Sequence, residues 1–113
     1  MDVQVQEKEN VTVIYLDGKL DGNAAPLVQE KIMTHVLAGC RLVIDLSKCD
    51  YISSAGLRIL LMIAKQLARE GGKWGLSSAS PEIIDVMDMT GFNSLFTHYD
   101  TVADAVSAFK KEA

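Results

Sequence analysis

The spacing of apolar and polar residues along the chain alternates between a pattern typical of strands and one typical of helices. Near the N-terminus apolar residues alternate with polar ones over residues 2–6, and 11–16 is rich in β-branched and aromatic residues. These patterns predict an edge strand with one solvated face and a neighbouring strand. The charged segment 7–10 predicts a turn, in which Asn10 suits a positive φ. We therefore expect an antiparallel hairpin whose second strand is broken at Asp17-Gly18.

Further along, four segments carry apolar residues at helical spacing, and three extended segments separate them. The helices begin at capping residues or prolines, and glycines end three of them. The predicted helices start near Ala24 and end before Gly39, extend from about Ala55 to Glu70, start at Ser80-Pro81 and end before Gly91, and follow a Thr101-x-x-Asp104 capping box. The predicted strands are Arg41–Leu46, Trp74–Leu76 and Leu95–Tyr99, with a polar turn and a short extended piece at Tyr51-Ile52 after the first.

The resulting element order is β-β-α-β-α-β-α-β-α, with no internal repeat, low-complexity tract or linker. Strands that alternate with helices imply parallel crossover connections and a mixed sheet. We predict an α/β fold in one domain, residues 1–113, with about five strands and four helices.

Composition narrows the class of function. The 113 residues are 49% hydrophobic and carry a net charge of −4, without a basic stripe interleaved with aromatic residues. This favours a packed globular domain and disfavours direct nucleic-acid binding. The polar N-terminal segment does not resemble a signal peptide, and no apolar run is long enough for membrane insertion. Cys40 and Cys49 are expected to be reduced thiols rather than a disulfide or a metal site, so we expect a cytoplasmic protein without a cofactor.

The chemically suggestive segment is the predicted junction between a strand and the long helix, where Ser53 and Ser54 precede Ala55-Gly56. A hydroxyl at this position lies beside the unpaired N–H groups of the first helical turn, in a positive partial field. The simplest interpretation is a helix cap, since serine is among the commonest capping residues. A second interpretation is a protein-level switch, in which a phosphate on Ser54 adds about −1.5 to −2 charges.

Two catalytic or ligand-binding interpretations have less support. A hydrolase nucleophile needs the Gly-x-Ser-x-Gly elbow, of which only the second half is present, and a base for which His98 is the only late histidine. Neither glycine-rich phosphate-binding motif occurs. Asp45 at a strand end lacks the acidic pair and the lysine of a receiver-type phosphoryl site. The sequence therefore favours a binding module with no catalytic residues and no metal site over an enzyme.

Several segments together resemble one known family. Residues 42–47 (LVIDLS) and 51–57 (YISSAGL) are similar to the anti-sigma factor antagonists, the STAS domains. The segments 18–21 (GKLD) and 79–92 (ASPEIIDVMDMTGF) also resemble that family, so the likeness covers essentially the whole chain in order. The serine–glycine–leucine segment is its most specific part.

The resemblance implies a bacterial regulator that binds an anti-sigma factor, or a related switch-type serine kinase, and thereby releases a sigma factor. The same kinase class would phosphorylate the chain, and a serine phosphatase would reverse this. The family's acceptor serine lies two residues before the glycine, which is Ser54 here, and Asp21 matches the family's acidic residue near the acceptor. Many members have aspartate before the acceptor and serine or threonine after it, whereas this chain has Ser53 and Ala55. Ser53 is therefore a rival acceptor.

The expected partner-binding residues lie around this junction: Asp21, Ser53, Ala55, Gly56, Arg58 and Met62. Ala55 and Gly56 would allow a partner to approach closely, and Arg58 and Met62 follow at intervals of one helical turn. The alternative from another class is a STAS-type module that senses a small ligand, a nucleotide or a lipid, without phosphorylation.

Overall fold

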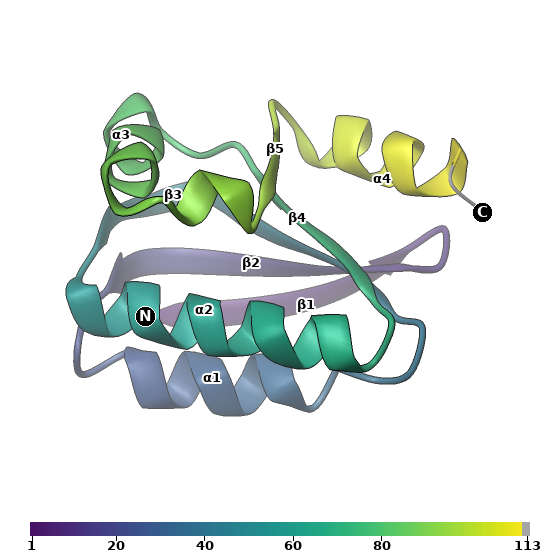
Figure 1. Ribbon diagram of the computed structural model, residues 1–113, viewed down its shortest axis with the longest axis horizontal. Coiled ribbons are helices and arrows are strands. Elements are labelled where there is room, and N and C mark those ends of the chain that lie inside the picture. Colours follow the sequence, from purple (N-terminus) through teal and green to yellow (C-terminus); the bar gives the residue numbers. More distant parts are fainter. Residues whose placement is uncertain (112–113) are drawn as a thin grey trace.

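In the computed structural model, which describes residues 1–111, five strands form a single mixed sheet in the order β1-β2-β3-β4-β5 (Figure 1). β1 and β2 are antiparallel, and the remaining neighbours are parallel. The α/β class, the five strands and the four helices confirm the prediction. The elements are β1 Asp2–Lys8, β2 Val11–Leu20, α1 Ala25–Met33, β3 Arg41–Ile52, α2 Ser54–Arg69, β4 Lys73–Ser77, α3 Pro81–Thr90, the short 3-10 helix η1 Phe92–Ser94, β5 Thr97–Tyr99 and α4 Val102–Lys111.

The predicted hairpin is present and closes through a two-residue turn. Lys8 pairs with Val11, and the two residues between them, Glu9 and Asn10, have φ values of 52° and 70°. Positive φ at both central residues is the type I′ geometry, whose twist matches that of the flanking strands. The expected positive φ at Asn10 is confirmed.

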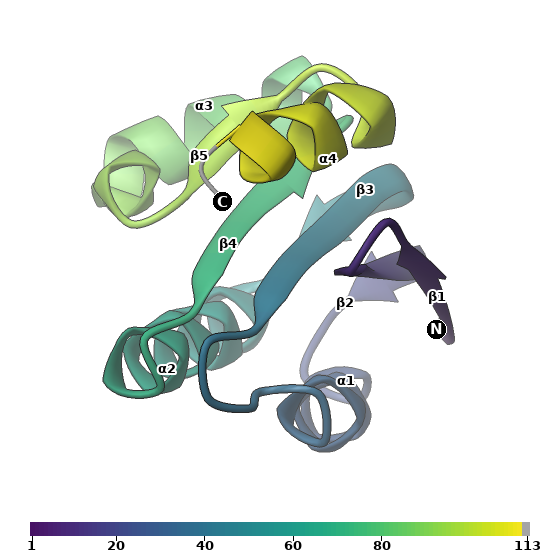
Figure 2. The same ribbon diagram turned by 90° about the vertical axis from the view of Figure 1, so that its right-hand side faces the viewer.

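Alternate residues of the central strands enter two separate cores. Ile14 and Ile44 belong to the larger core, which α1, α2 and α3 help to form. Val13 and Val43 point the other way and pack against α4. Figure 2 shows α1 and α2 side by side below the sheet and α4 above it. Because β2 and β3 are buried on both faces, they read as nearly continuous apolar runs.

The predicted turn after Leu46 is wrong, because β3 continues without a break through residues 47–50 to Ile52. The predicted break in β2 is also wrong, since this strand runs on to Leu20. Beyond Asp45 only β2 pairs with β3, with register shifts after Tyr15 and after Gly18. The polar side chains in this segment are therefore those of an irregular two-stranded extension, where fewer side chains face the core.

Two boundaries also differ from the sequence prediction. Helix α1 ends at Met33, six residues before Gly39, because the N–H of His35 turns back to the carbonyl of Ile32 in a tighter turn. The last strand begins at Thr97, two residues later than predicted, because the chain before it forms the unpredicted 3-10 helix η1 over residues 92–94. By contrast, α3 has the expected boundaries at its Ser80 cap and at Gly91, whose φ is 78°.

Candidate docking site at the start of helix α2

The two junction serines have different environments. Ser53 is half-buried and is the N-cap of α2, since its hydroxyl oxygen accepts a hydrogen bond from the N–H of Gly56 at 3.1 Å. Its own N–H donates to the carbonyl of Leu20 at 2.9 Å, which ties the end of β3 to the end of β2. The Ser53 hydroxyl therefore already has a structural role at the start of the helix.

Ser54 is the first residue of α2 and its side chain is exposed. The first turn of α2 contains no acidic residue, so the positive end of the helix dipole is not compensated from within the helix. An exposed hydroxyl at this end can accept a negative group without disturbing the helix cap that Ser53 provides.

Gly56, in the same first turn, is buried and faces the interior of the molecule. A Cβ at this position would lie 2.6 Å from the carbonyl oxygen of Leu20 and 2.8 Å from that residue's Cγ. Both distances are shorter than a carbon atom tolerates. The missing side chain thus lets α2 approach β2. The prediction that Gly56 leaves room for a partner is wrong, because this position faces the interior.

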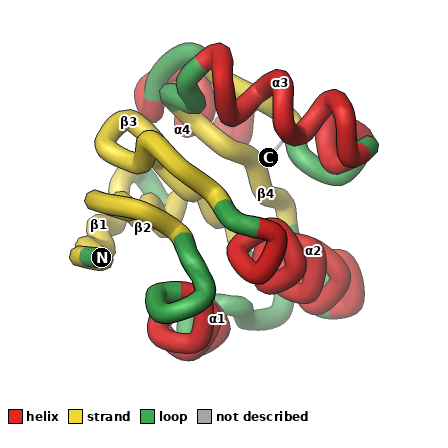
Figure 3. The backbone as a smooth tube through the Cα atoms, turned by 90° about the vertical axis from the view of Figure 1, so that its left-hand side faces the viewer, coloured by secondary structure: helices red, strands yellow, loops and turns green. Residues whose placement is uncertain are grey.

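Asp21 begins the neighbouring loop, which leads from β2 into α1. Its Oδ1 accepts hydrogen bonds from the N–H groups of Asn23 at 3.1 Å and Ala24 at 3.0 Å, so the carboxylate organises the entrance to α1. Figure 3 looks onto this end of the sheet, where the loops into α1 and α2 lie side by side. The predicted proximity of Asp21 to the serine junction follows from the Ser53–Leu20 hydrogen bond.

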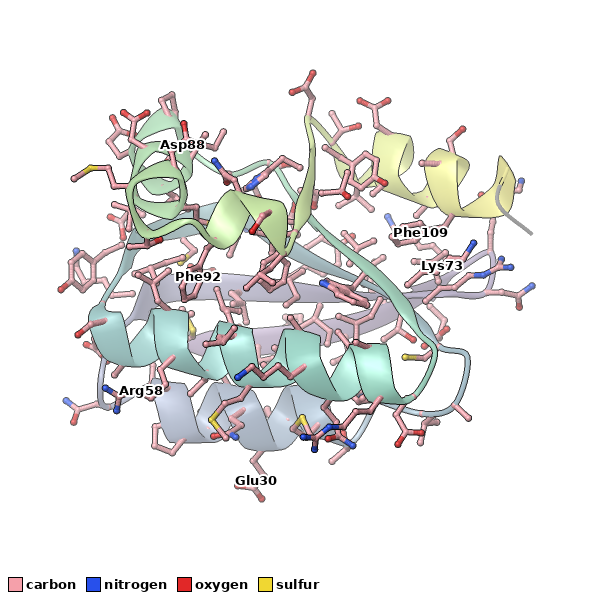
Figure 4. The ribbon with its side chains drawn as sticks, in the orientation of Figure 1. Glu30, Arg58, Lys73, Asp88, Phe92 and Phe109 are labelled. Atoms are coloured by element: carbon pink, nitrogen blue, oxygen red, sulfur yellow. The ribbon has the colours of Figure 1, made fainter. Side chains whose placement is uncertain are left out.

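Three exposed residues form a stripe along α2 at intervals of four: Ser54, Arg58 and Met62. Arg58 projects outward near the N-terminal end of the helix (Figure 4). Met62 is 48% exposed, and its sulfur lies 3.9 Å from Nε2 of Gln29 on α1. We call these three residues together with Ala55 the α2 face. Ile59 and Ile63 are buried and do not belong to it, so Met62 is the large apolar side chain of the α2 face.

Asp45 and Asp50, both on β3, have different environments. Asp45 is 3% exposed and accepts hydrogen bonds from the hydroxyls of Ser77 at 2.8 Å and Ser47 at 2.5 Å. It points to the opposite face of the sheet from Ile44, and its two serine partners give it a structural role. Asp50 is exposed and lies 3.8 Å from Lys19. A phosphate at Ser54 would therefore not meet the Asp45 carboxylate.

Sequence reasoning missed a second exposed feature at this end of the sheet. Tyr51 is 47% exposed, and the ammonium group of Lys19 lies 5.6 Å from the centre of its ring. The pairing of Lys19 with Tyr51 across the extended parts of β2 and β3 brings the two side chains together. The sequence hides this signal because it predicts a strand break at Asp17-Gly18 and a short extended piece at Tyr51-Ile52 rather than two continuous strands.

The hydrolase interpretation has no geometric support. Nε2 of His98 lies 2.6 Å from Oδ1 of Asn93, and Nδ1 is buried without a hydrogen-bond partner. Burial lowers the pKa of His98, and the charge of Asp88 opposes that shift in part. His98 therefore belongs to a structural contact between η1 and β5 and makes no contact with Ser54.

Among residues 1–111 no cluster of three His, Cys, Asp or Glu side chains is arranged to hold a metal ion. Cys40 and Cys49 are both free thiols. Burial raises the pKa of the Cys49 thiol, although hydrogen bonding to backbone groups of Tyr51 and Leu20 opposes this. Within the same described range, no helix has the length and apolar character needed to cross a membrane.

Comparison with known proteins gives consistent results. The family model for the STAS domain matches residues 2–105. BtrV of Bordetella bronchiseptica, named provisionally as an anti-sigma factor antagonist, is 32% identical over 111 residues, which are 97% of this chain and 96% of that protein.

Two solved structures have the same fold. The crystal structure of an anti-sigma factor antagonist from Mycobacterium paratuberculosis superposes with a TM-score of 0.84 and 30% identity, covering 96% of this chain and 93% of that one. The Bacillus cell fate determinant SpoIIAA in its phosphorylated form gives a TM-score of 0.73 and 22% identity, covering 96% and 99%.

Proposed function

The chain belongs to the STAS domain family, and on that premise we propose that it is an anti-sigma factor antagonist whose docking is switched by phosphorylation of Ser54. Membership places it among regulatory proteins rather than enzymes. The proposed partner is an anti-sigma factor of the serine-kinase type, and a serine phosphatase would restore the binding form.

The observation that carries the proposal is the difference between the two junction serines. Ser53 is half-buried and its hydroxyl caps α2, so a phosphate there would replace the bond to the N–H of Gly56. Ser54 is exposed, and the hydroxyl that caps α2 is that of Ser53 and not that of Ser54. A kinase could reach Ser54 without unfolding the start of the helix, which supports it over Ser53 as the acceptor.

Within the chain a phosphate on Ser54 has compensating effects. The N-terminal end of α2 stabilises a negative charge by about 0.3–1 kcal/mol. Arg58 lies four residues further along the same face, within the spacing at which oppositely charged side chains interact. The exposed carboxylate of Asp50 and the half-buried one of Asp21 oppose these terms. The net effect on the fold is therefore small.

At a docked interface the same phosphate has a large effect. A dianion that is desolvated against a partner surface costs several kcal/mol unless a basic group meets it. Pairing with the phosphate would also remove Arg58 from any contact with the partner. Because each 1.4 kcal/mol changes affinity tenfold, this is enough to abolish binding at cellular concentrations.

The remaining candidate contacts have distinct proposed roles. Arg58 would pair with an acidic group of the anti-sigma factor, and Met62 would supply the apolar part of the contact. The small side chain of Ala55 would let the partner approach the first turn of α2 closely. Ser53 and Asp21 would act indirectly, because their polar atoms hold the two helix entrances in position.

The test uses purified wild-type, Ser54→Ala and Ser54→Asp chains as baits, with mapping of phosphorylated sites in the recovered chain. We expect the anti-sigma factor to be recovered by the wild-type and Ser54→Ala chains and to be lost, by at least about tenfold in affinity, with Ser54→Asp. Phosphate should be found on Ser54 and be absent from the Ser54→Ala chain.

Ser107→Asp is the matched control, because Ser107 is an exposed serine on α4 and the substitution adds the same charge to a different face. This variant should bind like the wild type. Equal recovery of the anti-sigma factor by the Ser54→Ala and Ser54→Asp chains would rule out the switch, as would phosphate confined to Ser53.

A further inference from the structure

Among the described residues 1–111, only β2 pairs with β1, so the outer backbone edge of this long, regular strand has no partner strand there. Figure 2 shows it at the margin of the sheet. Its seven residues pair with β2 in an unbroken register, without a bulge, and the strand contains no proline. Side chains at its centre are uncharged, and Val5 is 40% exposed. Natural edge strands are usually short, bulged, or guarded by a central charge or proline, and β1 has none of these protections.

The register of the hairpin identifies which backbone groups face outward. In a two-residue type I′ hairpin the flanking pair, here Lys8 and Val11, is hydrogen-bonded, and bonded pairs then alternate along the ladder. The N–H and C=O groups of Gln4, Gln6 and Lys8 therefore point to β2. Those of Val3, Val5 and Glu7 point to the free edge.

The side-chain sequence of this edge is complementary to itself. If two copies of β1 pair antiparallel with Val5 at the centre, the outward N–H and C=O groups of Val5 in one copy bond to those of Val5 in the other. The outward groups of Val3 in each copy then bond to those of Glu7 in the other copy. Asp2 of each copy then lies opposite Lys8 of the other, and Gln4 lies opposite Gln6. These polar pairs occupy the non-hydrogen-bonded positions, where side chains approach most closely.

Other registers lose this match. A parallel pairing in register sets Asp2 beside Asp2 and Lys8 beside Lys8, and like charges in that position are destabilising. An antiparallel shift of two residues leaves no oppositely charged pair. Glu7 does not disturb the centred register, because its carboxylate already accepts a hydrogen bond from the hydroxyl of Thr12 at 2.6 Å.

We propose that β1 pairs antiparallel with β1 of a second copy of this chain, centred on Val5, so that two sheets join into one. The occupant is a second copy because charge and amide pairs recur symmetrically about one residue, as a twofold contact requires. None of the residues of the α2 face lies in β1, so the two surfaces are separate. The small contact area makes this a weak dimer that forms with rising concentration.

Sedimentation velocity over a range of concentrations tests the pairing. The wild type should pass from monomer to dimer, and Val5→Pro should stay monomeric throughout. Proline removes only an outward N–H and is tolerated on the solvent side of an edge strand, so the monomer should keep its circular dichroism spectrum. Val5→Thr keeps the N–H and should still dimerise. A wild type that stays monomeric at every concentration would overturn the proposal, even if β1 bound another protein.

The charge pairs test the register independently of proline. Lys8→Asp sets two aspartates opposite each other at both ends of the contact and should weaken dimerisation by about tenfold. The exchange variant Asp2→Lys/Lys8→Asp restores opposite charges and should regain the wild-type dissociation constant. Failure of the exchange to rescue, or a dimer that survives Val5→Pro, would contradict the centred β1 pairing.

Discussion

Helices α2 and α3 each begin soon after a parallel strand, and each starts at a serine whose hydroxyl caps the helix. Ser53 accepts a hydrogen bond from the N–H of Gly56 at 3.1 Å, and Ser80 accepts one from the N–H of Ile83 at 3.2 Å. Both capping residues have extended backbone conformations. The two junctions thus share the local device that starts a helix, and the cap itself does not distinguish a switch from an ordinary helix start.

The difference lies in the residues that follow. After Ser80 comes Pro81, which offers no hydroxyl, and then Glu82, which already places a negative charge in the first turn. After Ser53 comes the exposed hydroxyl of Ser54, in a first turn without any acidic residue. The first turn of α3 already contains a negative charge that offsets the helix dipole. The first turn of α2 contains none and can still accept one. This contrast supports the proposal that Ser54 is the phosphorylated serine.

The largest predicted difference concerns the third helical position, which is Gly56 in α2 and the buried Ile83 in α3. Gly56→Ala should lower the free energy of unfolding by about 2 kcal/mol, because the new Cβ would lie 2.6 Å from the Leu20 carbonyl oxygen and overpacking exceeds the gain in helix propensity. Urea denaturation measures this. Gly22→Ala is the control, since nothing lies within 4 Å of its added Cβ. Equal stability of the two variants would mean that α2 does not depend on close approach to β2.

The helix caps at Ser53 and Ser80 should contribute similar amounts to the free energy of unfolding. Ser53→Ala and Ser80→Ala should each lower the free energy of unfolding by about 1 kcal/mol, because each leaves one N–H of a first turn without its partner. Urea denaturation of the two variants side by side checks this. A negligible loss at Ser53 would show that its hydroxyl is not committed to capping and would make Ser53 a candidate acceptor again.

A smaller difference should appear with pH on the α3 side of the molecule. Burial lowers the pKa of His98, so the unfolded chain binds a proton more readily than the folded chain. Stability should therefore be complete above the ordinary histidine pKa of about 6.5 and should decline as pH falls from there through the lower pKa of the folded state. The urea concentration at the unfolding midpoint of the wild type should fall as the pH is lowered below about 6.5. His98→Gln should remove that part of the decline, and an unchanged slope would assign it to other groups.

The smallest predicted effects test the charge contrast itself. Ser54→Asp should raise the free energy of unfolding by about 0.3–1 kcal/mol, because it supplies the acidic group that the first turn of α2 lacks. Glu82→Gln should lower the free energy of unfolding by a similar amount, because it removes the acidic residue from the first turn of α3. Thermal unfolding at low ionic strength is sensitive enough to detect both. A marked loss with Ser54→Asp would contradict the idea that the fold tolerates a phosphate there.

Local signals explain what could be predicted from the sequence. The Ser80-Pro81 start, the Asn10 turn and the serine junction each depend on a few adjacent residues with strong backbone preferences, and all three were located correctly. The polar segment 47–50 has the local pattern of a turn, and the sequence does not reveal its strand character because that depends on pairing with β2, more than thirty residues earlier in the chain.

The same distinction applies to the site. The sequence indicated both serines and the stripe at Arg58 and Met62, since helical spacing alone sets that stripe. It could not separate Ser53 from Ser54, because the choice depends on one hydrogen bond to Gly56 and on exposure. Nor could it show that Gly56 faces Leu20, which is a contact between segments distant in the chain.

The most direct test of the central claim uses a chain that carries phosphoserine at position 54, compared with the unmodified chain in two measurements. Isothermal titration calorimetry with the anti-sigma factor recovered by the wild-type chain gives the affinity, and urea denaturation gives the stability. The phosphorylated chain should bind at least about tenfold more weakly while its free energy of unfolding changes by less than about 1 kcal/mol. Unchanged affinity, or a loss of affinity explained by unfolding of α2, would contradict the proposed switch.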